Sequence, residues 1–363
     1  MLQPAAATAS SNKFGFLRLL LAALVIVSHS PEMVDGDRSR EILVQIFGTL
    51  SLGEAAVDGF FLISGYLIVP SVMRSPTRFT FIRKRLLRIV PGFVVAYLAT
   101  LLVVGPLVGG NLAGFTAGGI AEAAERMALL LGPKLEGAFS GLPRPQLNSA
   151  MWTIAYEFRC YVMALLLAEF GVLSRPRLYV AFTAVVFAAS AAMVTVALPA
   201  ELTVITGTVH DSVRFASIFL VGGGFYLLRD TMPAYRARTA CGCGVATVAA
   251  LFIPAAAEPG LVIAGGYVLF WFALGTSANR LNAIGQKTDI SYGLYLYAWP
   301  VQNAVIWFWA DVTPALVTLV SLPIAAALGY VSWTLVESRA LTFGRERPKG
   351  TSARRLDRPT KAS

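Results

Sequence analysis

Long apolar runs recur along almost the whole chain and limit what it can fold into. A helix needs about 20 predominantly apolar residues to cross the hydrocarbon core of a bilayer. Ten runs reach or approach that length, at residues 15–30, 50–70, 86–108, 147–170, 178–198, 212–228, 240–255, 260–277, 289–310 and 314–336. Only 14% of the residues are charged, against roughly a quarter in a soluble domain. The sequence therefore predicts an all-α integral membrane protein, a bundle of about ten transmembrane helices.

The placement of the basic residues predicts the orientation of this bundle. Arginine and lysine cluster in the connections after the second, fourth, sixth and eighth runs and in the tail after the tenth. Loops rich in these residues stay in the cytoplasm, so both termini are predicted to be cytoplasmic. We expect a short cytoplasmic N-terminus at residues 1–13, a transmembrane domain at 14–340 and a basic, disordered cytoplasmic tail at 341–363. The net charge of +10 then reflects topology, and we expect membrane lipids rather than nucleic acid as partners.

Two further features limit the possible functions. The long connection at 109–146 contains an amphipathic stretch, Ile120–Leu131, of the kind that lies on a membrane surface. The chain has three cysteines, too few for a disulfide framework. Cys241 and Cys243 form a lone C-x-C pair without a nearby histidine or second cysteine pair, so we expect no metal site.

The first apolar run carries two polar residues that are costly in a membrane, Arg18 and His29. Their spacing of eleven residues is close to three helical turns, about 16 Å, and places both side chains on nearly the same face. In one interpretation Arg18 extends to the headgroups and His29 caps the helix at the opposite interface. In the other, this helix is one wall of a buried reaction channel that joins the two sides of the membrane.

A basic segment precedes the third run and offers a site for a phosphorylated ligand. Arg83 and Lys84 are equally consistent with a cluster that only touches anionic lipid. Arg85 and Arg88 differ, because they lie three residues apart on one helical face and already within the apolar pattern. Two guanidinium groups at the cytoplasmic mouth of a bundle suit a phosphate, which each can bind in bidentate fashion.

The fourth run contains an intramembrane carboxylate, Glu157, with Arg159 two residues later. Such a carboxylate is a functional candidate by default. The alternative is a structural ion pair with Arg18, Arg159 or Arg214.

Four more polar residues lie within or at the ends of apolar runs. Asn148 and Trp152 lie at the outer end of the fourth run, level with His29 in the predicted topology. Asp58 and Ser64 lie in the second run, among glycines that favour close helix packing. No base neighbours Ser64 in the sequence, so a nucleophilic role for it is weakly supported.

Taken together, the runs and their motifs resemble the membrane-bound acyltransferase 3 family, the O-acyltransferases of bacterial cell-surface glycans. No single motif is diagnostic, but they occur in order along nearly the whole chain. The matching features are Arg18-x10-His29, VDGFFLISGYLI at Val57–Ile68, FIRKRLLRIVP at Phe81–Pro91, SAMWTIAYEFRCY at Ser149–Tyr161, DISYGLYLYAWPV at Asp289–Val301 and WTLVESRALTF at Trp333–Phe343. One departure is Ala298, which stands where many relatives have histidine.

The resemblance implies how the principal candidate residues would take part in acyl transfer. Arg18, Arg85 and Arg88 would hold acyl-CoA, a co-substrate that enters from the cytoplasm, with acetyl-CoA the expected donor and no bound cofactor. His29 would be the catalytic base or a transient acyl acceptor. Glu157, in the W-x4-E position, would tune or orient the reacting groups. The acceptor would be a hydroxyl of a cell-surface glycan or lipid-linked saccharide, and the location the bacterial inner membrane.

The remaining candidates would support these residues or contact the acceptor. They are Asp58, Ser64, Asn148, Trp152, Tyr156 and Arg159. The transfer needs a base for the hydroxyl proton, which histidine suits because it titrates near neutrality. It also needs donors at the developing oxyanion, for which the arginines, Tyr156 and Trp152 are candidates. A rival hypothesis is a polytopic transporter or flippase for a glycan or lipid-linked substrate, although we find no internal repeat of the kind typical of transporters.

Overall fold

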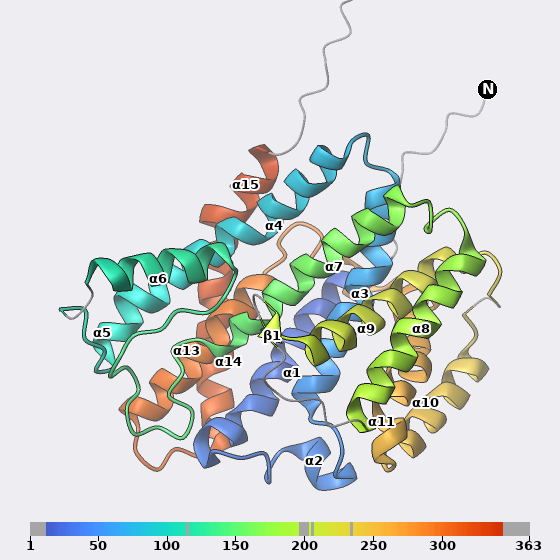
Figure 1. Cartoon of the computed structure of the whole chain (residues 1–363). Coiled ribbons are helices and arrows are strands. Elements are labelled where there is room, and N and C mark those ends of the chain that lie inside the picture. The colour runs from blue at the N-terminus through green and yellow to red at the C-terminus, as the bar shows by residue number, and fades with distance from the viewer. Residues whose placement is uncertain (1–11, 114–115, 196–202, 205–206, 233–234, 344–363) are drawn as a thin grey trace, which may run out of the picture.

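The computed structural model describes residues 12–113, 116–195, 203–204, 207–232 and 235–343, and within these ranges the chain is almost entirely helical (Figure 1). The helices are α1 Phe14–Asp35, α2 Ile42–Phe47, α3 Leu52–Met73, α4 Arg78–Ala99, α5 Gly105–Leu107, α6 Ala117–Ala128, α7 Trp152–Glu169, α8 Pro176–Thr195, α9 Val209–Leu227, α10 Ala237–Leu251, α11 Pro254–Gly260, α12 Gly266–Phe270, α13 Ser291–Phe308, α14 Pro314–Ser332 and α15 Ser338–Phe343. The short strands β1 (Thr203–Val204) and β2 (Gly207–Thr208) pair antiparallel, with Thr203 opposite Thr208.

Several of these helices continue one another through tighter or wider turns. Wide, π-helical turns join α4 to α5 at Thr100–Val104, α11 to α12 at Leu261–Gly265, and α14 to α15 at Trp333–Glu337, and another extends α12 to Gly275. Short 3-10 turns occur at Ser149–Met151, directly before α7, and at Arg280–Ala283.

Seven helical stretches in the described part of the chain are long and apolar enough to cross a membrane. They are Phe14–Asp35, Leu52–Met73, Arg78–Leu107, Ser149–Glu169, Pro176–Met193, Pro254–Gly275 and Pro314–Phe343. This confirms a helical, multi-pass membrane protein. The other three predicted spans form α9, α10 and α13, but α10 has only 15 residues and α9 and α13 are not apolar enough. The count of ten spans and the sidedness of the termini stay predictions.

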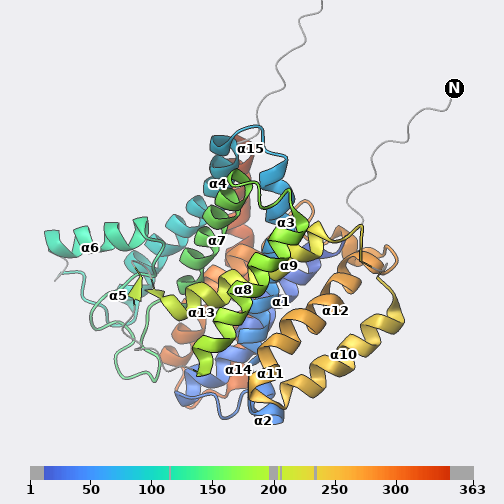
Figure 2. The ribbon, with the colours of Figure 1, turned by 45° about the vertical axis from the view of Figure 1, so that its right-hand side comes forward.

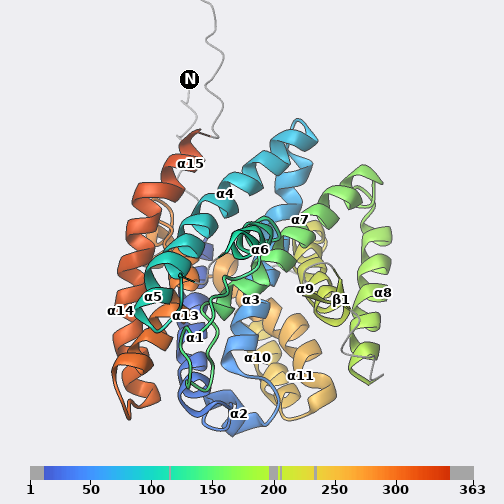
Figure 3. The same cartoon turned by 60° about the vertical axis from the view of Figure 1, so that its left-hand side comes forward.

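Helix α1 lies inside the bundle and is packed against α3, α13 and α14 (Figures 1 and 3). Helices α3 and α9 approach most closely, because glycines face backbone at their contact. A Cβ atom on Gly65 would stand 1.9 Å from the carbonyl oxygen of Phe219, and one on Gly222 would stand 2.1 Å from that of Leu62. Gly65 of the second run therefore packs helices, as the sequence predicted, and Gly222 of α9 does the same from the other side of the contact.

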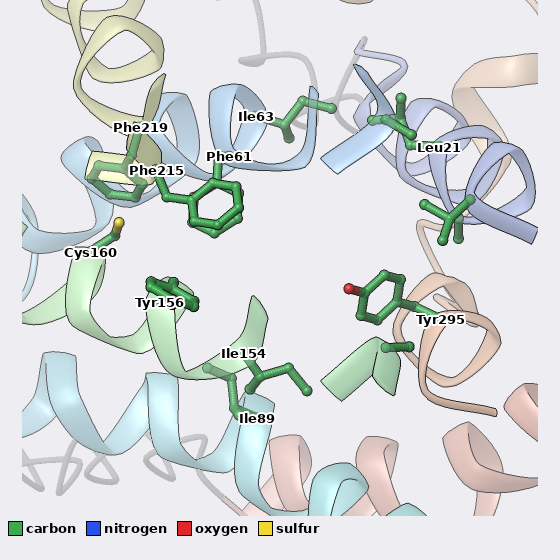
Figure 4. Packing of buried hydrophobic residues seen from close by; sticks show 14 of the residues in the cluster. Leu21, Phe61, Ile63, Ile89, Ile154, Tyr156, Cys160, Phe215, Phe219 and Tyr295 are labelled. Carbon is green, nitrogen blue, oxygen red and sulfur yellow. The ribbon is translucent and has the colours of Figure 1, made fainter. Parts of the chain in front are cut away.

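Aromatic side chains fill the core between α3, α7 and α9. Phe61 stacks on Phe215 with ring centroids 4.3 Å apart, and Tyr156 packs against Phe215 at 5.3 Å. Figure 4 shows these rings gathered close together, with Tyr295 of α13 on the opposite side of the view. Helices α10, α11 and α12 form a group at the edge of the bundle (Figure 2).

The division into a short N-terminus, a transmembrane domain and a basic tail stays a prediction, because most of both predicted ends lies outside the described residues. Helix α15 continues to Phe343, three residues into the predicted tail. Residues 1–11 and 344–363 lie outside the described residues. The predicted amphipathic stretch 120–131 corresponds to α6 at Ala117–Ala128, which has no buried residue.

Candidate active site

Two of the three predicted donor-binding arginines converge on one carboxylate. Arg18 of α1 and Arg88 of α4 each donate to the same oxygen of Asp289, Oδ2, at 2.8 and 2.7 Å. The loop that carries Asp289 lies directly before α13, about 200 and 270 residues away from its two partners. The structure therefore brings the predicted cations together through a residue that was singled out only as part of a motif.

The other oxygen of Asp289 is also bound. Its Oδ1 accepts hydrogen bonds from the hydroxyl and the backbone N–H of Ser291, at 2.6 and 3.2 Å. Burial by itself would raise the pKa of Asp289, but the nearby charges of Arg18 and Arg88 and the two Ser291 hydrogen bonds outweigh it and lower the pKa. Asp289 is thus held as a carboxylate between the two arginines.

Arg88 has a second acidic neighbour. Its Nη1 lies 3.6 Å from Oε2 of Glu337, whose side chain is only 1% exposed. Glu337 also accepts a hydrogen bond of 3.0 Å from Ser332. The guanidinium of Arg88 faces the rings of Tyr292 and Trp333 at 5.7 and 5.8 Å. These contacts fix the orientation of the Arg88 guanidinium.

Arg85 is held differently from its two neighbours. Its guanidinium lies 5.9 Å from the ring centroids of both Phe81 and Tyr161. Its Nε atom is buried and has no hydrogen-bond partner in the described structure. A buried donor without a hydrogen-bond partner costs free energy, so the guanidinium of Arg85 is suited to bind a ligand anion.

All three arginines line one cavity, which lies between α1, α3, α4, α7 and α13. Its volume is about 130 Å³, room for on the order of ten water molecules. Besides the arginines, the polar groups that line it come from Ser64, Thr153, Glu157, Tyr161, Ser291, Tyr292 and Tyr295. Phe61, Ile63, Ile89, Ile154 and Tyr295, labelled in Figure 4, are among the residues that line this cavity. The predicted residues Arg18, Arg85, Arg88, Glu157 and Ser64 are thus neighbours.

Glu157 enters the cavity with hydroxyl partners. Tyr161, one turn later on α7, donates to its Oε1 atom, and Ser64 of α3 donates to the same atom at 3.3 Å. Of the arginines proposed as alternative ion-pair partners, Arg18 binds Asp289 and Arg214 binds two other carboxylates. Neither of them therefore pairs with Glu157, and its carboxylate remains directed at the cavity.

His29 lies at the other end of α1 and does not line this cavity. Its Nδ1 atom is 3.5 Å from Oε2 of Glu32, one turn along the helix, and makes no hydrogen bond. The ring packs edge-on against Trp299 of α13, with centroids 5.2 Å apart. Glu32 is itself fixed by Arg38 and Arg144, each at 3.0 Å.

Sequence reasoning missed Glu32, although a signal was present. A glutamate three residues after a histidine on one helix faces it, and the spacing can be read from the sequence. In the structure the Glu32 carboxylate lies on the Nδ1 side of the imidazole ring, 3.5 Å away.

Three of the remaining candidates face away from the cavity. Asp58, fully buried, forms a bidentate ion pair with Arg214 of α9 at 2.7 and 2.8 Å. The hydroxyl of Tyr156 accepts from the backbone N–H of Thr208 at 2.9 Å. Arg159 donates to Ser212 at 2.6 Å. These residues join α3 and α7 to α9 and are not brought to the arginine cavity.

The last two candidates, Asn148 and Trp152, line a separate cleft beneath α6. Asn148 is buried and donates from Nδ2 to the carbonyl of Leu296 at 2.8 Å, while its Oδ1 atom has no partner. Trp152 is 41% exposed. The arrangement therefore separates an inner cavity rich in arginine from the surroundings of His29 and from this cleft.

Comparison with known proteins identifies the chain. A family model described as an acyltransferase domain matches residues 12–336. The chain belongs to the acyltransferase 3 family. It is also 29% identical over 356 residues to an O-acetyl transferase of Shigella phage Sf6, covering 93% of this chain and 98% of that protein. No solved structure matches it significantly. The protein is an O-acyltransferase with a multi-pass, helical membrane domain.

Proposed function

We propose that this protein transfers an acyl group, expected to be acetyl, from cytoplasmic acyl-CoA to a hydroxyl of a cell-surface glycan or lipid-linked saccharide. The proposed location is the inner membrane of a bacterium. The observation that supports it best is the convergence of Arg18, Arg85 and Arg88 on one cavity beside the helix that carries His29. The name of the phage relative supports acetyl as the transferred group.

In this proposal the arginine cavity receives the donor. The phosphates of CoA bind guanidinium groups, and Arg85 is the first candidate because its Nε has no protein partner. Asp289 neutralises part of the charge of Arg18 and Arg88. These two arginines would therefore orient the phosphates more than they add net positive charge to the cavity. The thioester then has to reach along α1 toward His29, a helical distance of about 16 Å from Arg18.

His29 supplies the proton chemistry in either of two ways. As a general base, its Nε2 accepts the proton of the acceptor hydroxyl while that oxygen attacks the thioester carbonyl. The C–S bond then breaks, CoA leaves, and the thiolate takes up a proton. As a transient acceptor, Nε2 first attacks the thioester carbonyl, the C–S bond breaks and CoA leaves. The acceptor oxygen then attacks the acyl carbonyl, the bond between the acyl carbon and Nε2 breaks, and the freed imidazole takes up the hydroxyl proton. In both schemes Nε2 is the reacting nitrogen, because Nδ1 lies on the side of the Glu32 carboxylate, 3.5 Å away.

The test is an assay of purified protein in nanodiscs. CoA release from acetyl-CoA is followed with de-O-acylated oligosaccharides from the host surface as acceptor. Arg85→Gln should raise the KM for acetyl-CoA about 10- to 100-fold, because a hydrogen bond to a charged group contributes about 1.5–3 kcal/mol. Lys84→Gln, at the exposed neighbouring position, is the matched control and should change the KM little.

Two outcomes would contradict the proposal. If wild-type protein releases no CoA with any such acceptor, the donor or the acceptor class is wrong, and transport of a saccharide becomes the better hypothesis. If Arg85→Gln behaves like Lys84→Gln, the donor does not bind at the arginine cavity.

A further inference from the structure

The cleft beneath α6 contains features that neither the donor cavity nor the surroundings of His29 explain. It is about 630 Å³ in volume, within the range of small-molecule sites. It is lined by residues of α6, of the connection that follows α6, and of the start of α7. The hydroxyl of Tyr97 on α4 donates to the carbonyl of Ala123 at 3.1 Å and so attaches α6 to the bundle.

A partly exposed aromatic side chain, Trp152, lines this cleft. Trp152 is 41% exposed, although its ring also contacts Tyr156 and Phe215 at 5.6 and 5.5 Å. These contacts hold the indole in one orientation. A rigid, partly exposed indole offers a flat apolar surface with a polar edge, which fits the C–H face of a pyranose ring and its flanking hydroxyls.

A buried polar atom at the same cleft has no partner. Asn148 is 3% exposed, and its Oδ1 makes no hydrogen bond. Its Nδ2 is fixed on the carbonyl of Leu296 at 2.8 Å, so the amide cannot turn to satisfy itself elsewhere. A buried acceptor of this kind calls for a donor from a ligand or water. A sugar hydroxyl is such a donor.

The cleft is lined by equal numbers of acidic and basic side chains. Glu122 and Glu136 face the same cleft as Arg126 and Lys134, two of each sign. A phosphate would meet as many carboxylates as cations here. A hydroxyl-rich ligand can use both, because hydroxyl groups donate to carboxylates and accept from cations. The chemistry favours a saccharide over a nucleotide.

The wall of the cleft is continuous with the surroundings of His29. Gln146 lines the cleft, and its carbonyl accepts from the indole N–H of Trp299 at 2.8 Å. The ring of Trp299 in turn contacts the His29 imidazole. Two residues before Gln146, Arg144 binds Glu32 at 3.0 Å. One short segment therefore forms part of the cleft and part of the frame around the proposed base.

We propose that the cleft between α6 and the start of α7 binds the saccharide acceptor, with a sugar ring on Trp152 and a hydroxyl donating to Oδ1 of Asn148. This inference rests on the proposed function and names the acceptor site within it. The bound saccharide would lie against the segment that contacts the surroundings of His29.

The kinetic test uses the full protein in nanodiscs with de-O-acylated host oligosaccharides. Trp152→Ala should raise the KM for the oligosaccharide about tenfold or more, while the KM for acetyl-CoA stays within twofold. Trp152→Phe should recover most of the loss, because it keeps an aromatic face. Trp309→Ala is the control, since Trp309 is 49% exposed and lies outside the cleft. An unchanged oligosaccharide KM in Trp152→Ala would overturn the assignment.

A labelling test does not depend on turnover. Lys134→Cys is introduced into a background in which Cys241 and Cys243 are replaced by serine, and its reaction rate with a membrane-impermeant maleimide is measured. The oligosaccharide should slow this reaction at least about threefold. It should not slow the reaction of Glu125→Cys, at an exposed position of α6 outside the cleft. Equal rates with and without oligosaccharide for Lys134→Cys would overturn the assignment.

The two tests separate this inference from the proposed function. If wild-type protein transfers no acyl group, the proposed function fails, whereas protection of Lys134→Cys still reports saccharide binding at the cleft. If wild-type protein transfers acyl groups but neither Trp152→Ala nor the labelling shows an effect, only the acceptor site is wrong.

Discussion

Replacing Asp289 by asparagine is the most informative perturbation of the arginine cluster. The substitution keeps the size of the side chain but removes the charge that Arg18 and Arg88 share at 2.8 and 2.7 Å. Removing one partner of a buried ion pair costs about 3–5 kcal/mol, because the remaining charge stays buried and uncompensated. The side chains of Asp289, Arg88 and Arg18 are 13%, 16% and 26% exposed, so we expect the lower end, about 3 kcal/mol.

The assay follows thermal unfolding through a buried thiol. Cys160 is 3% exposed, so in a background with Cys241 and Cys243 replaced by serine, a thiol-reactive dye reports its exposure. A loss of about 3 kcal/mol corresponds to a fall in Tm of roughly 4 °C, at an unfolding entropy of about 2.1 cal/mol/K for each of the 363 residues. Asp230→Asn is the matched control: Asp230 pairs with Arg229 at 3.1 Å but is 79% exposed, and such pairs contribute about 1 kcal/mol or less.

The pH dependence gives a second measurement on the same residue. Folding lowers the pKa of Asp289, so its contribution to stability is full above the unfolded value of about 3.9. It is lost only as the pH falls through the lower, folded value. The Tm difference between wild type and Asp289→Asn should therefore persist from pH 7 down to about pH 5. Equal Tm values for Asp289→Asn and wild type, with Asp230→Asn also unchanged, would refute the view that Asp289 holds the arginines together.

Two further predictions concern the packing of α3. Gly65→Ala should abolish accumulation of folded protein, because its Cβ would stand 1.9 Å from the carbonyl oxygen of Phe219. The control is Gly244→Ala, whose Cβ would have nothing within 4 Å and which should give a normal yield of folded protein in size-exclusion chromatography. Equal yields of the two variants would contradict the α3–α9 contact. Asp58→Asn should lower the free energy of unfolding by about 3–5 kcal/mol, because it leaves Arg214 buried beside one remaining carboxylate; an unchanged Tm in the thiol assay would show that the ion pair is not energetically important.

The helical, multi-pass architecture could be predicted from the sequence because each span is a local signal. Twenty apolar residues predict a helix whatever their neighbours are. The same locality explains why Arg85 and Arg88 were assigned correctly to one face of one helix. The pairing of Arg18 and Arg88 with Asp289 was not predicted, because these arginines lie about 270 and 200 residues before Asp289, respectively.

The sequence also did not predict which face of α7 points into the cavity. Tyr156, Glu157 and Arg159 were grouped as neighbours of one site because they are close in the chain. Successive residues on a helix point about 100° apart, and only Glu157 enters the cavity. Tyr156 and Arg159 contact the region around α9 instead. Which face of an apolar helix meets which neighbour depends on packing that a single sequence does not contain.

The most direct test of acyl transfer by this protein is glycan mass spectrometry on a bacterial strain from which its gene has been deleted. The strain is complemented with the wild-type gene or with His29→Ala, and membrane levels of the two proteins are matched by blotting. Wild type should restore a mass increment for each transferred acyl group, and His29→Ala should restore none. Full restoration by His29→Ala would contradict the catalytic role of this histidine, and no increment with wild type would contradict acyl transfer to the surface glycan.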